Sequence, residues 1–135
     1  MGTLLVLSRD ECLQLLGRGR VGRVAFTEQA LPAIRPVTYS LVGSHLVIRT
    51  EAAGLGRRLD GQVVAFEVDE IDPVEQSGWS VVVTGSARLL REPGEVLRGQ
   101  AHGPVSLAGP GREGVVVIVP GDITGRRLGL EHGAA

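Results

Sequence analysis

The sequence predicts a mainly β domain in which six antiparallel strands form a closed or partly closed barrel. Runs rich in Val, Ile and Phe recur along the chain and are separated by short turns, which is typical of an all-β fold. Helical stretches are few and short, and strands do not alternate with long helices as they do in a βαβ fold. The expected strands are Val21–Thr27, Leu31–Val42, His45–Thr50, Val63–Asp69, Trp79–Leu90 and Gly114–Pro120.

A short helix is expected before the first of these strands. Ser8 and Glu11 have the spacing of a capping box, in which each side chain accepts a hydrogen bond from a backbone N–H at the start of the helix. The apolar residues within 12–16 give this helix one buried side. Gly17 and Gly19 are expected to end it.

The connections between the strands differ in character. Gly43-Ser44 predicts a tight hairpin between the second and third strands. Residues 51–60 have the composition of a short helix weakened by two glycines. The segment 92–111 contains three prolines and five glycines, so we expect a mostly irregular connection with one helical turn at Glu95–Arg98. A single domain is expected to span residues 1–135, with a frayed tail from about residue 130.

Composition excludes several classes of function. The net charge is −1, so no global basic field favours nucleic acid or an acidic membrane surface. All 14 basic residues are arginine, which excludes a lysine Schiff base and a Walker A phosphate loop. No apolar run approaches the roughly 20 residues of a membrane span. The first residues lack a basic signal-peptide region, and the lone Cys12 cannot form an internal disulfide. We therefore expect a cytoplasmic protein.

Three local patterns have simpler explanations than the chemistry they evoke. Gly17–Gly22 matches the dinucleotide pattern G-x-G-x-x-G, but here a helix precedes it and a strand follows, the reverse of a dinucleotide fold. His45, His102 and His132 have no metal-ligand spacing, so no metal site is expected. The acidic residues between 60 and 75 are typical of a solvated strand edge. No residue has the local signature of a catalytic nucleophile, acid or base.

Arg49 and Thr50 are the strongest candidates for ligand binding on residue chemistry alone. They come at the end of a strand, and Arg57 and Arg58 follow within one short segment. Guanidinium groups bind phosphate oxygens through paired hydrogen bonds, and a threonine hydroxyl adds another. The pattern indicates either a phosphate site or a group of surface arginines.

A set of motifs that occur in a fixed order resembles one known family. They cover roughly residues 8–128 and are the capped helix, Gly-Arg-Val-Ala-Phe, Arg-Pro-Val-Thr-Tyr, Leu-Val-Ile-Arg-Thr, Val-Ala-Phe-Glu-Val-Asp-Glu-Ile-Asp, Gly-Trp-Ser-Val-Val-Val-Thr-Gly-Ser-Ala and Ile-Thr-Gly-Arg-Arg-Leu. The chain resembles the flavin-binding split-barrel proteins related to pyridoxamine 5′-phosphate oxidase. The resemblance implies a six-stranded split barrel that forms a homodimer with flavin mononucleotide (FMN) at the subunit interface.

The resemblance also implies an activity and residue roles. It implies an FMN-dependent oxidoreductase that acts on a small planar substrate. The flavin ring edge is expected along the strand that contains Pro36, Val37, Thr38 and Tyr39. The phosphate is expected at Arg49, Thr50 and Arg57. Trp79 and Ser80 are expected to approach the flavin from the partner subunit.

One departure from the family pattern keeps other functions open. Leu55 stands where relatives place a phosphate-binding lysine. A deazaflavin-dependent reductase is the first alternative, with Arg18, Arg20 and Arg58 lining a basic groove for the coenzyme tail. A non-catalytic flavin-binding protein or a cofactor-free module is the second. The stretch 100–112 also differs from the usual connection, so the sequence does not indicate the substrate or the electron donor.

Overall fold

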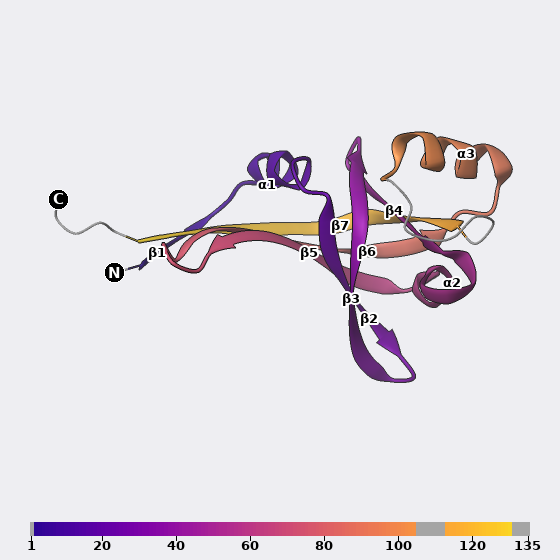
Figure 1. The fold of residues 1–135 in the computed structure, drawn as a ribbon, viewed down its shortest axis with the longest axis horizontal. Helices are drawn as coiled ribbons and strands as arrows, with labels where there is room; N and C mark the ends of the chain where they lie inside the picture. The colour runs from indigo at the N-terminus through magenta and orange to yellow at the C-terminus, as the bar shows by residue number, and fades with distance from the viewer. Residues whose placement is uncertain (1, 105–112, 131–135) are drawn as a thin grey trace.

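The computed structural model describes residues 2–104 and 113–130, and Figure 1 shows their arrangement. The strands and helices alternate irregularly along the chain. In order they are β1 (Gly2–Val6), α1 (Arg9–Leu16), β2 (Val21–Glu28), β3 (Leu31–Val42), β4 (His45–Glu51), η1 (Ala52–Gly56), α2 (Arg57–Leu59), β5 (Val63–Asp72), β6 (Ser77–Leu89), α3 (Pro93–His102) and β7 (Glu113–Leu130).

Six antiparallel strands form a ring. The sheet order is β1-β7-β4-β3-β2-β5-β6, and a further pairing between β7 and β6 closes β2–β7 on themselves. Every one of these pairings is antiparallel. The predicted six-stranded antiparallel barrel is therefore confirmed, and β1 is a seventh strand added at the far end of β7.

Apolar side chains fill the interior of the ring. The alternating burial of β5 and β6 places one face of each strand in a cluster that contains Phe66, Val81 and Val83, all fully buried. Leu16 from α1 and Leu59 from α2 close this cluster. A second, smaller cluster of Val47, Leu90 and Val115 lies outside the ring, with Val96 of α3 packed against it.

The barrel is split between β3 and β4. β3 pairs with β2 over its first part, Leu31–Thr38, and with β4 only over Tyr39–Val42. Beyond the pair Tyr39 and Ile48, no ladder joins β3 to β4 in the part of the chain that the structure describes. In Figure 1, β2 and β3 run across the direction of β5–β7, and the β2–β3 hairpin extends beyond the other strands.

The helix α1 begins as the sequence predicts. Ser8 accepts from the backbone N–H of Glu11 at 3.2 Å, and the Glu11 carboxylate accepts from the N–H of Ser8 at 2.9 Å. Gly17 is the C-cap, and a strand follows the glycine-rich loop. This order of elements confirms that the loop lacks the strand-then-helix context of a dinucleotide site.

The expectation of an irregular connection over 92–111 is wrong for its first part. Pro93–His102 forms the helix α3, and residues 105–111 lie outside the described chain. Glu92 caps the helix by accepting from the N–H groups of Gly94 and Glu95 at 2.9 and 2.8 Å. Pro93 occupies the first helical turn, where its missing N–H costs nothing.

The structure extends β7 well beyond its expected end and adds the strand β1. β7 runs to Leu130 instead of ending at Pro120, because a register shift near Thr84 and Gly85 accommodates Pro120 and the ladder then resumes at Asp122. β1 was not expected at all, and it pairs with the added length of β7. β1 could not be predicted from the sequence, because its pairing partner is the part of β7 that was not expected to form a strand.

Candidate functional site

A groove lies beside β3, between the loop that follows α1 and the end of α3. Its volume is ≈ 490 Å³. In Figure 1 the end of β3 rises between α1 and α3. The residues that line this groove are Gly17, Gly19, Arg20, Thr38, Tyr39, Ser40, Leu41, Gly103 and Pro104.

Tyr39 fixes the wall of the groove next to α1. Its hydroxyl donates to the carbonyl of Leu16 at 2.6 Å, and its ring packs edge-on against Phe66 with centroids 4.9 Å apart. Burial raises the pKa of Tyr39 to about 12, so the phenol remains a hydrogen-bond donor at neutral pH. A Cβ on Gly19 would come within 3.1 Å of the Tyr39 ring, so only glycine lets the loop cover the tyrosine this closely.

Ser40 connects β3 to the end of α3, which forms the other wall of the groove. Side chains alternate along β3, so Tyr39 faces the core and Ser40 faces outward. The Ser40 hydroxyl donates to the carbonyl of His102, the last residue of α3, at 3.0 Å. This bond helps to hold Gly103 and Pro104 beside β3.

The backbone of β3 directs polar groups into the split. The N–H of Tyr39 donates to the carbonyl of Arg20 at 2.9 Å, on the β2 side. Because backbone groups alternate in direction in an antiparallel ladder, those of Pro36 and Thr38 point to the opposite edge, where β4 diverges. Pro36 supplies only a carbonyl there, since proline has no N–H.

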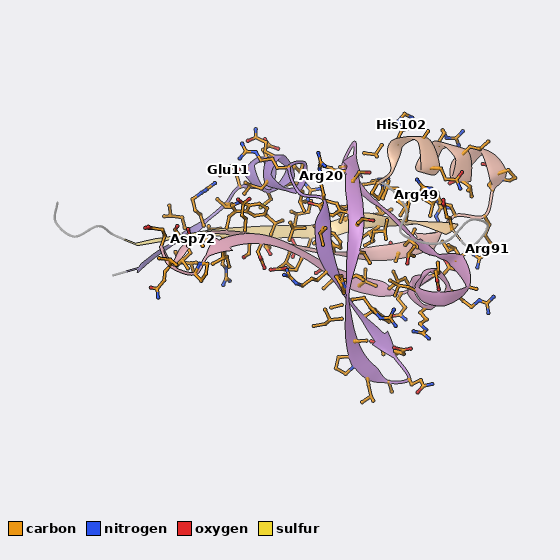
Figure 2. The ribbon with its side chains drawn as sticks, viewed as in Figure 1. Glu11, Arg20, Arg49, Asp72, Arg91 and His102 are labelled. Atoms are coloured by element: carbon orange, nitrogen blue, oxygen red, sulfur yellow. The ribbon has the colours of Figure 1, made fainter. Side chains whose placement is uncertain are left out.

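Arg49 lies directly behind the groove. Its guanidinium donates to the carbonyl of Pro104 at 3.1 Å and to the carboxylate of Glu113. Its side chain is 15% exposed, and Nε is buried without a partner among the described residues. Figure 2 shows Arg49 below the end of α3 that carries His102. An anion at this position could bond to Nε but would have to compete with Glu113 for the remaining nitrogens.

The structure does not gather the other predicted phosphate residues around Arg49. Thr50 follows Arg49 within β4, so the two side chains leave on opposite faces of the strand. Arg57 is exposed at the start of α2, and in Figure 1 α2 lies on the other side of the strands from α3. Leu55 is 6% exposed and belongs to the barrel core, so it does not face a ligand in the chain as described.

Trp79 and Ser80 occupy opposite faces of β6. Trp79 is 8% exposed and packs in the main core, which leaves little of its indole for a second subunit. Ser80 lies on the outer face, in a shallow hollow with Val82, Thr124 and Arg126. Neither residue lines the groove, and their predicted contacts with a flavin in the partner subunit stay predictions.

Three residues of the site could not have been identified from the sequence. Gly103 and Pro104 lie in a stretch that seemed irregular, and their position depends on α3 and on Ser40. Glu113 is the first residue of β7 and belongs to no motif, and it reaches Arg49 only because β4 pairs with β7. A single sequence contains no signal for these contacts, since all of them join segments distant in the chain.

The side chains that line the groove can bind a ligand, and none of them is suited to transfer a proton at neutral pH.

Outside the groove, the described part of the chain offers neither a reactive thiol nor a metal-binding cluster. Cys12 is fully buried in the core, and burial raises the pKa of its thiol, which disfavours a nucleophilic role. Within residues 2–104 and 113–130, no group of three His, Cys, Asp or Glu side chains could hold a metal ion. Among the helices described, none has the length and apolarity to cross a membrane.

A carboxylate pair lies elsewhere, on the outer face of β5. Arg23 NH1 contacts Glu67 Oε1 at 2.9 Å and Asp69 Oδ2 at 3.3 Å. Burial, and then the hydrogen bond and charge of Asp69, raise the pKa of Glu67 to about 7 and outweigh the effect of Arg23. Between about pH 4.5 and 7, Glu67 therefore holds a proton in the folded state that it has released in the unfolded chain.

Glu67→Gln should consequently change how stability depends on pH. A raised folded pKa makes the wild type lose stability as pH increases from about 4.5 to about 7, and the neutral amide removes that loss. We expect the Tm of the variant relative to wild type to rise across this window by roughly 2 °C or more and then to level off. Thermal melts of the variant and of the wild type at a series of pH values across this window measure the difference in Tm, with Glu70→Gln on the same strand as the control. A difference in Tm between Glu67→Gln and wild type that stays constant with pH would contradict the raised pKa of Glu67.

Comparisons with known proteins agree with the geometry of the barrel. A family model for pyridoxamine 5′-phosphate oxidase matches residues 8–127. The chain is 42% identical over 130 residues to Rv0080, an uncharacterized protein of Mycobacterium tuberculosis, covering 90% of this chain and 84% of that protein.

Solved structures with the same fold include proteins that bind a flavin. A FAD-binding protein from Mycobacterium smegmatis superposes with a TM-score of 0.82 at 30% identity, covering 94% of this chain and 100% of that one. A FAD-binding protein from Mesorhizobium loti has a TM-score of 0.76, covering 92% of this chain and 97% of that one. At its 22% identity, the second likeness concerns the fold alone.

Proposed function

The chain belongs to the pyridoxamine 5′-phosphate oxidase family, and from this premise we propose that it binds FMN in the groove beside β3 and acts as a flavin-dependent oxidoreductase. The observation that carries the proposal is the groove itself, which opens where β3 separates from β4. The FAD-binding relative from Mycobacterium smegmatis, similar over the whole of its chain, supports a flavin as the ligand class.

The groove has the size and lining that a flavin ring needs. A volume of ≈ 490 Å³ lies within the roughly 300–1,000 Å³ of small-molecule sites. Glycines of the α1 loop and Leu41 offer flat and apolar surface for an aromatic ring. The backbone of Pro36 and Thr38 points toward the split, where the polar edge of the ring can bond to it. The residues therefore fit the ring of the cofactor.

The phosphate end depends on Arg49. Its Nε is a buried donor with no partner in residues 2–104 and 113–130, and an incoming phosphate oxygen could satisfy it. Glu113 opposes this, because its carboxylate already neutralises the guanidinium and would repel a second anion. We propose Arg49 as the phosphate ligand and Glu113 as a residue that limits affinity, while Thr50 and Arg57 stay predictions.

Two substitutions with opposite effects test the assignment of the phosphate. Arg49→Gln should weaken FMN binding roughly tenfold or more, because a charge-assisted hydrogen bond is lost. Glu113→Gln should strengthen it several-fold, because the amide no longer competes for the guanidinium. Flavin fluorescence titration measures both affinities. Arg57→Gln is the matched control, and a loss of affinity there but not at Arg49 would move the phosphate to α2.

The chain's own residues bind and orient, and none is proposed as a proton donor or acceptor. A bound flavin supplies the capacity to accept and donate a hydride, and a small planar substrate would lie against its ring. Tyr39 holds the α1 loop over the groove, and its raised pKa keeps it from acting as an acid at neutral pH. Ser40 holds the end of α3 against the other side.

A homodimer is the assembly that we propose for this function. Leu31, Ile34 and Val63 are each about two-thirds exposed or more, on β3 and on β5. Figure 1 shows the β2–β3 hairpin, to which Leu31 and Ile34 belong, projecting from the barrel. Exposed apolar side chains on such a projection suit contact with a second copy. Sedimentation equilibrium should give twice the mass of the chain, and a monomer at micromolar concentration would contradict the assembly.

Two alternatives follow from particular residues. Arg20 lines the groove and is exposed, which suits the anionic tail of a deazaflavin coenzyme. The pairing of Arg49 with Glu113, together with Leu55, instead favours a non-catalytic flavin-binding protein or a cofactor-free module. Thermal melts with FMN and with the deazaflavin coenzyme identify which coenzyme binds, or that neither does, since only a bound ligand raises the Tm. Reduction of bound FMN by an electron donor, followed by reoxidation with a substrate, separates an oxidoreductase from a non-catalytic flavin-binding protein.

A further inference from the structure

A second pocket lies beneath α3, on the outer face of β4, β6 and β7, and we refer to it as the α3 pocket. Its volume is ≈ 410 Å³. It is separate from the flavin groove, with which it shares no lining residue. The two are nevertheless adjacent, because His102 lines the α3 pocket and Gly103 lines the groove.

The floor of the α3 pocket is apolar. Val47 of β4, Val117 of β7 and Leu90, which follows β6, line it, and Val42 of β3 lies at its edge. Val47 and Leu90 are buried in the small cluster under α3, whereas Val42 is 39% exposed. A ligand body that covered this floor would remove apolar surface from water, which stabilises binding by about 25 cal/mol per Å².

The rim of the pocket is basic. Arg88, Arg98, His45 and His102 line it, and Glu95 is its one carboxylate. With neutral imidazoles these residues carry a net charge of +1, in a chain whose net charge is −1. Within the described residues neither histidine makes a side-chain hydrogen bond, so a ligand that bonded to either ring would break none of the bonds among these residues.

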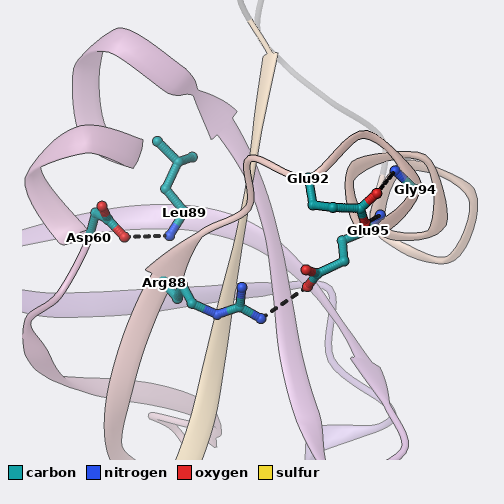
Figure 3. A network of polar contacts seen from close by, with 6 residues as sticks. All are labelled: Asp60, Arg88, Leu89, Glu92, Gly94 and Glu95. Carbon is teal, nitrogen blue, oxygen red and sulfur yellow. Dashed lines mark hydrogen bonds and ion pairs between the residues drawn. The ribbon is translucent and has the colours of Figure 1, made fainter.

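The single carboxylate is already occupied. Glu95 accepts from Arg88 NH2 at 3.1 Å, and Figure 3 shows this bond joining β6 to the first turn of α3. Arg88 remains 59% exposed, so its other nitrogens are accessible. Arg98 has no ion pair within 4.0 Å among the residues described. The pKa of the nearby Glu92 carboxyl is lowered mainly by the backbone N–H groups of Gly94 and Glu95, and to a smaller extent by the charge of Arg98. The rim thus carries two guanidinium groups against one carboxylate, which favours an anion over a cation.

We propose that the α3 pocket binds a small amphipathic carboxylate, with its apolar body on the valine and leucine floor and its carboxylate at Arg98 and His102. The charge of the rim selects an anion, and the floor selects an apolar body. Phosphate alone would leave the floor uncovered, and a neutral alkyl chain would leave the basic rim unpaired. This site does not depend on the flavin proposal, since the two cavities have different linings.

Decanoate is a suitable probe of this site. Decanol has the alkyl chain without the carboxylate, and acetate has the carboxylate without the long chain. Isothermal titration calorimetry of the full chain should show one decanoate per chain, with weaker binding of decanol and none of acetate. Arg98→Gln combined with His102→Gln should weaken decanoate roughly tenfold or more, because charge-assisted hydrogen bonds are lost. Val42→Trp should weaken it by filling the mouth of the pocket. Arg9→Gln, on the first turn of α1, is the control and should leave the affinity unchanged.

The outcomes separate this site from the groove. Saturating FMN should leave decanoate affinity unchanged or alter it only modestly, whether or not the protein uses the flavin. Absence of decanoate binding, equal affinity for decanol, or an unaltered affinity in both pocket variants would overturn the proposal. Competition between decanoate and FMN would place the carboxylate in the groove and would overturn it as well.

Discussion

Gly17→Trp should abolish measurable FMN binding and leave the fold intact. Gly17 lines the groove but has φ −65° and ψ −17°, a right-handed helical conformation that any residue adopts. A Cβ there would lie 3.6 Å from two backbone carbonyls and 3.9 Å from Leu41, all ordinary contacts. The indole would then occupy the space that the flavin ring needs. We expect the affinity to fall by about 100-fold or more, which corresponds to about 2.7 kcal/mol.

The matched control for this substitution is Gly129→Trp. A Cβ at Gly129 meets no atom within 4 Å, and the residue lies near the end of β7, opposite Thr3 of β1. Fluorescence titration with FMN and a thermal melt of each variant complete the comparison. If Gly17→Trp bound FMN as tightly as Gly129→Trp while both stayed folded, the flavin would lie outside the groove.

Phe66→Ala should produce the largest loss of stability in the barrel. Phe66 is fully buried, contacts Tyr39 edge-on, and fills the space above Gly22, where a Cβ would come within 2.9 Å of its ring. Removing the ring loses its burial and leaves a cavity between β2 and β5. Such changes cost about 3–5 kcal/mol, which is a large part of the stability of a small domain.

Urea denaturation at fixed protein concentration measures this loss, since association would otherwise change the apparent stability. Val74→Ala, in the turn after β5, is the control, because Val74 is 85% exposed and should change the free energy of unfolding by less than about 0.5 kcal/mol. A loss below about 1 kcal/mol for Phe66→Ala would mean that the ring is not the centre of the core.

The barrel was predictable because its strands carry strong local signals. Apolar β-branched residues, the hairpin at Gly43 and the capping box at Ser8 each reflect a short-range preference, and the structure contains all of these elements. Only one turn of helix α3, at Glu95–Arg98, was expected, because Pro93 and the glycines of this segment resemble helix breakers. A proline in the first turn favours a helix, however, and Gly99 lets α3 approach Val115.

The site was less predictable, because it depends on which segments meet. The sequence places Arg49 and Thr50 side by side, yet alternation along β4 sends them to opposite faces. Arg49 bonds to Pro104 and Glu113, which are more than fifty residues away in the chain. Trp79 is expected to approach the flavin of a partner subunit, and in this chain its side chain packs in the barrel core. Of the residues expected to bind the flavin, Thr38 and Tyr39 line the groove beside β3, and their role there stays a prediction.

Titration of the purified chain with FMN tests the central claim most directly, once any small molecule bound during expression has been removed and identified by its absorbance and mass. We predict that flavin fluorescence changes saturably at one FMN per chain and that FMN raises the Tm. Failure of FMN to bind or to raise the Tm would contradict the account of a flavin site in the groove beside β3.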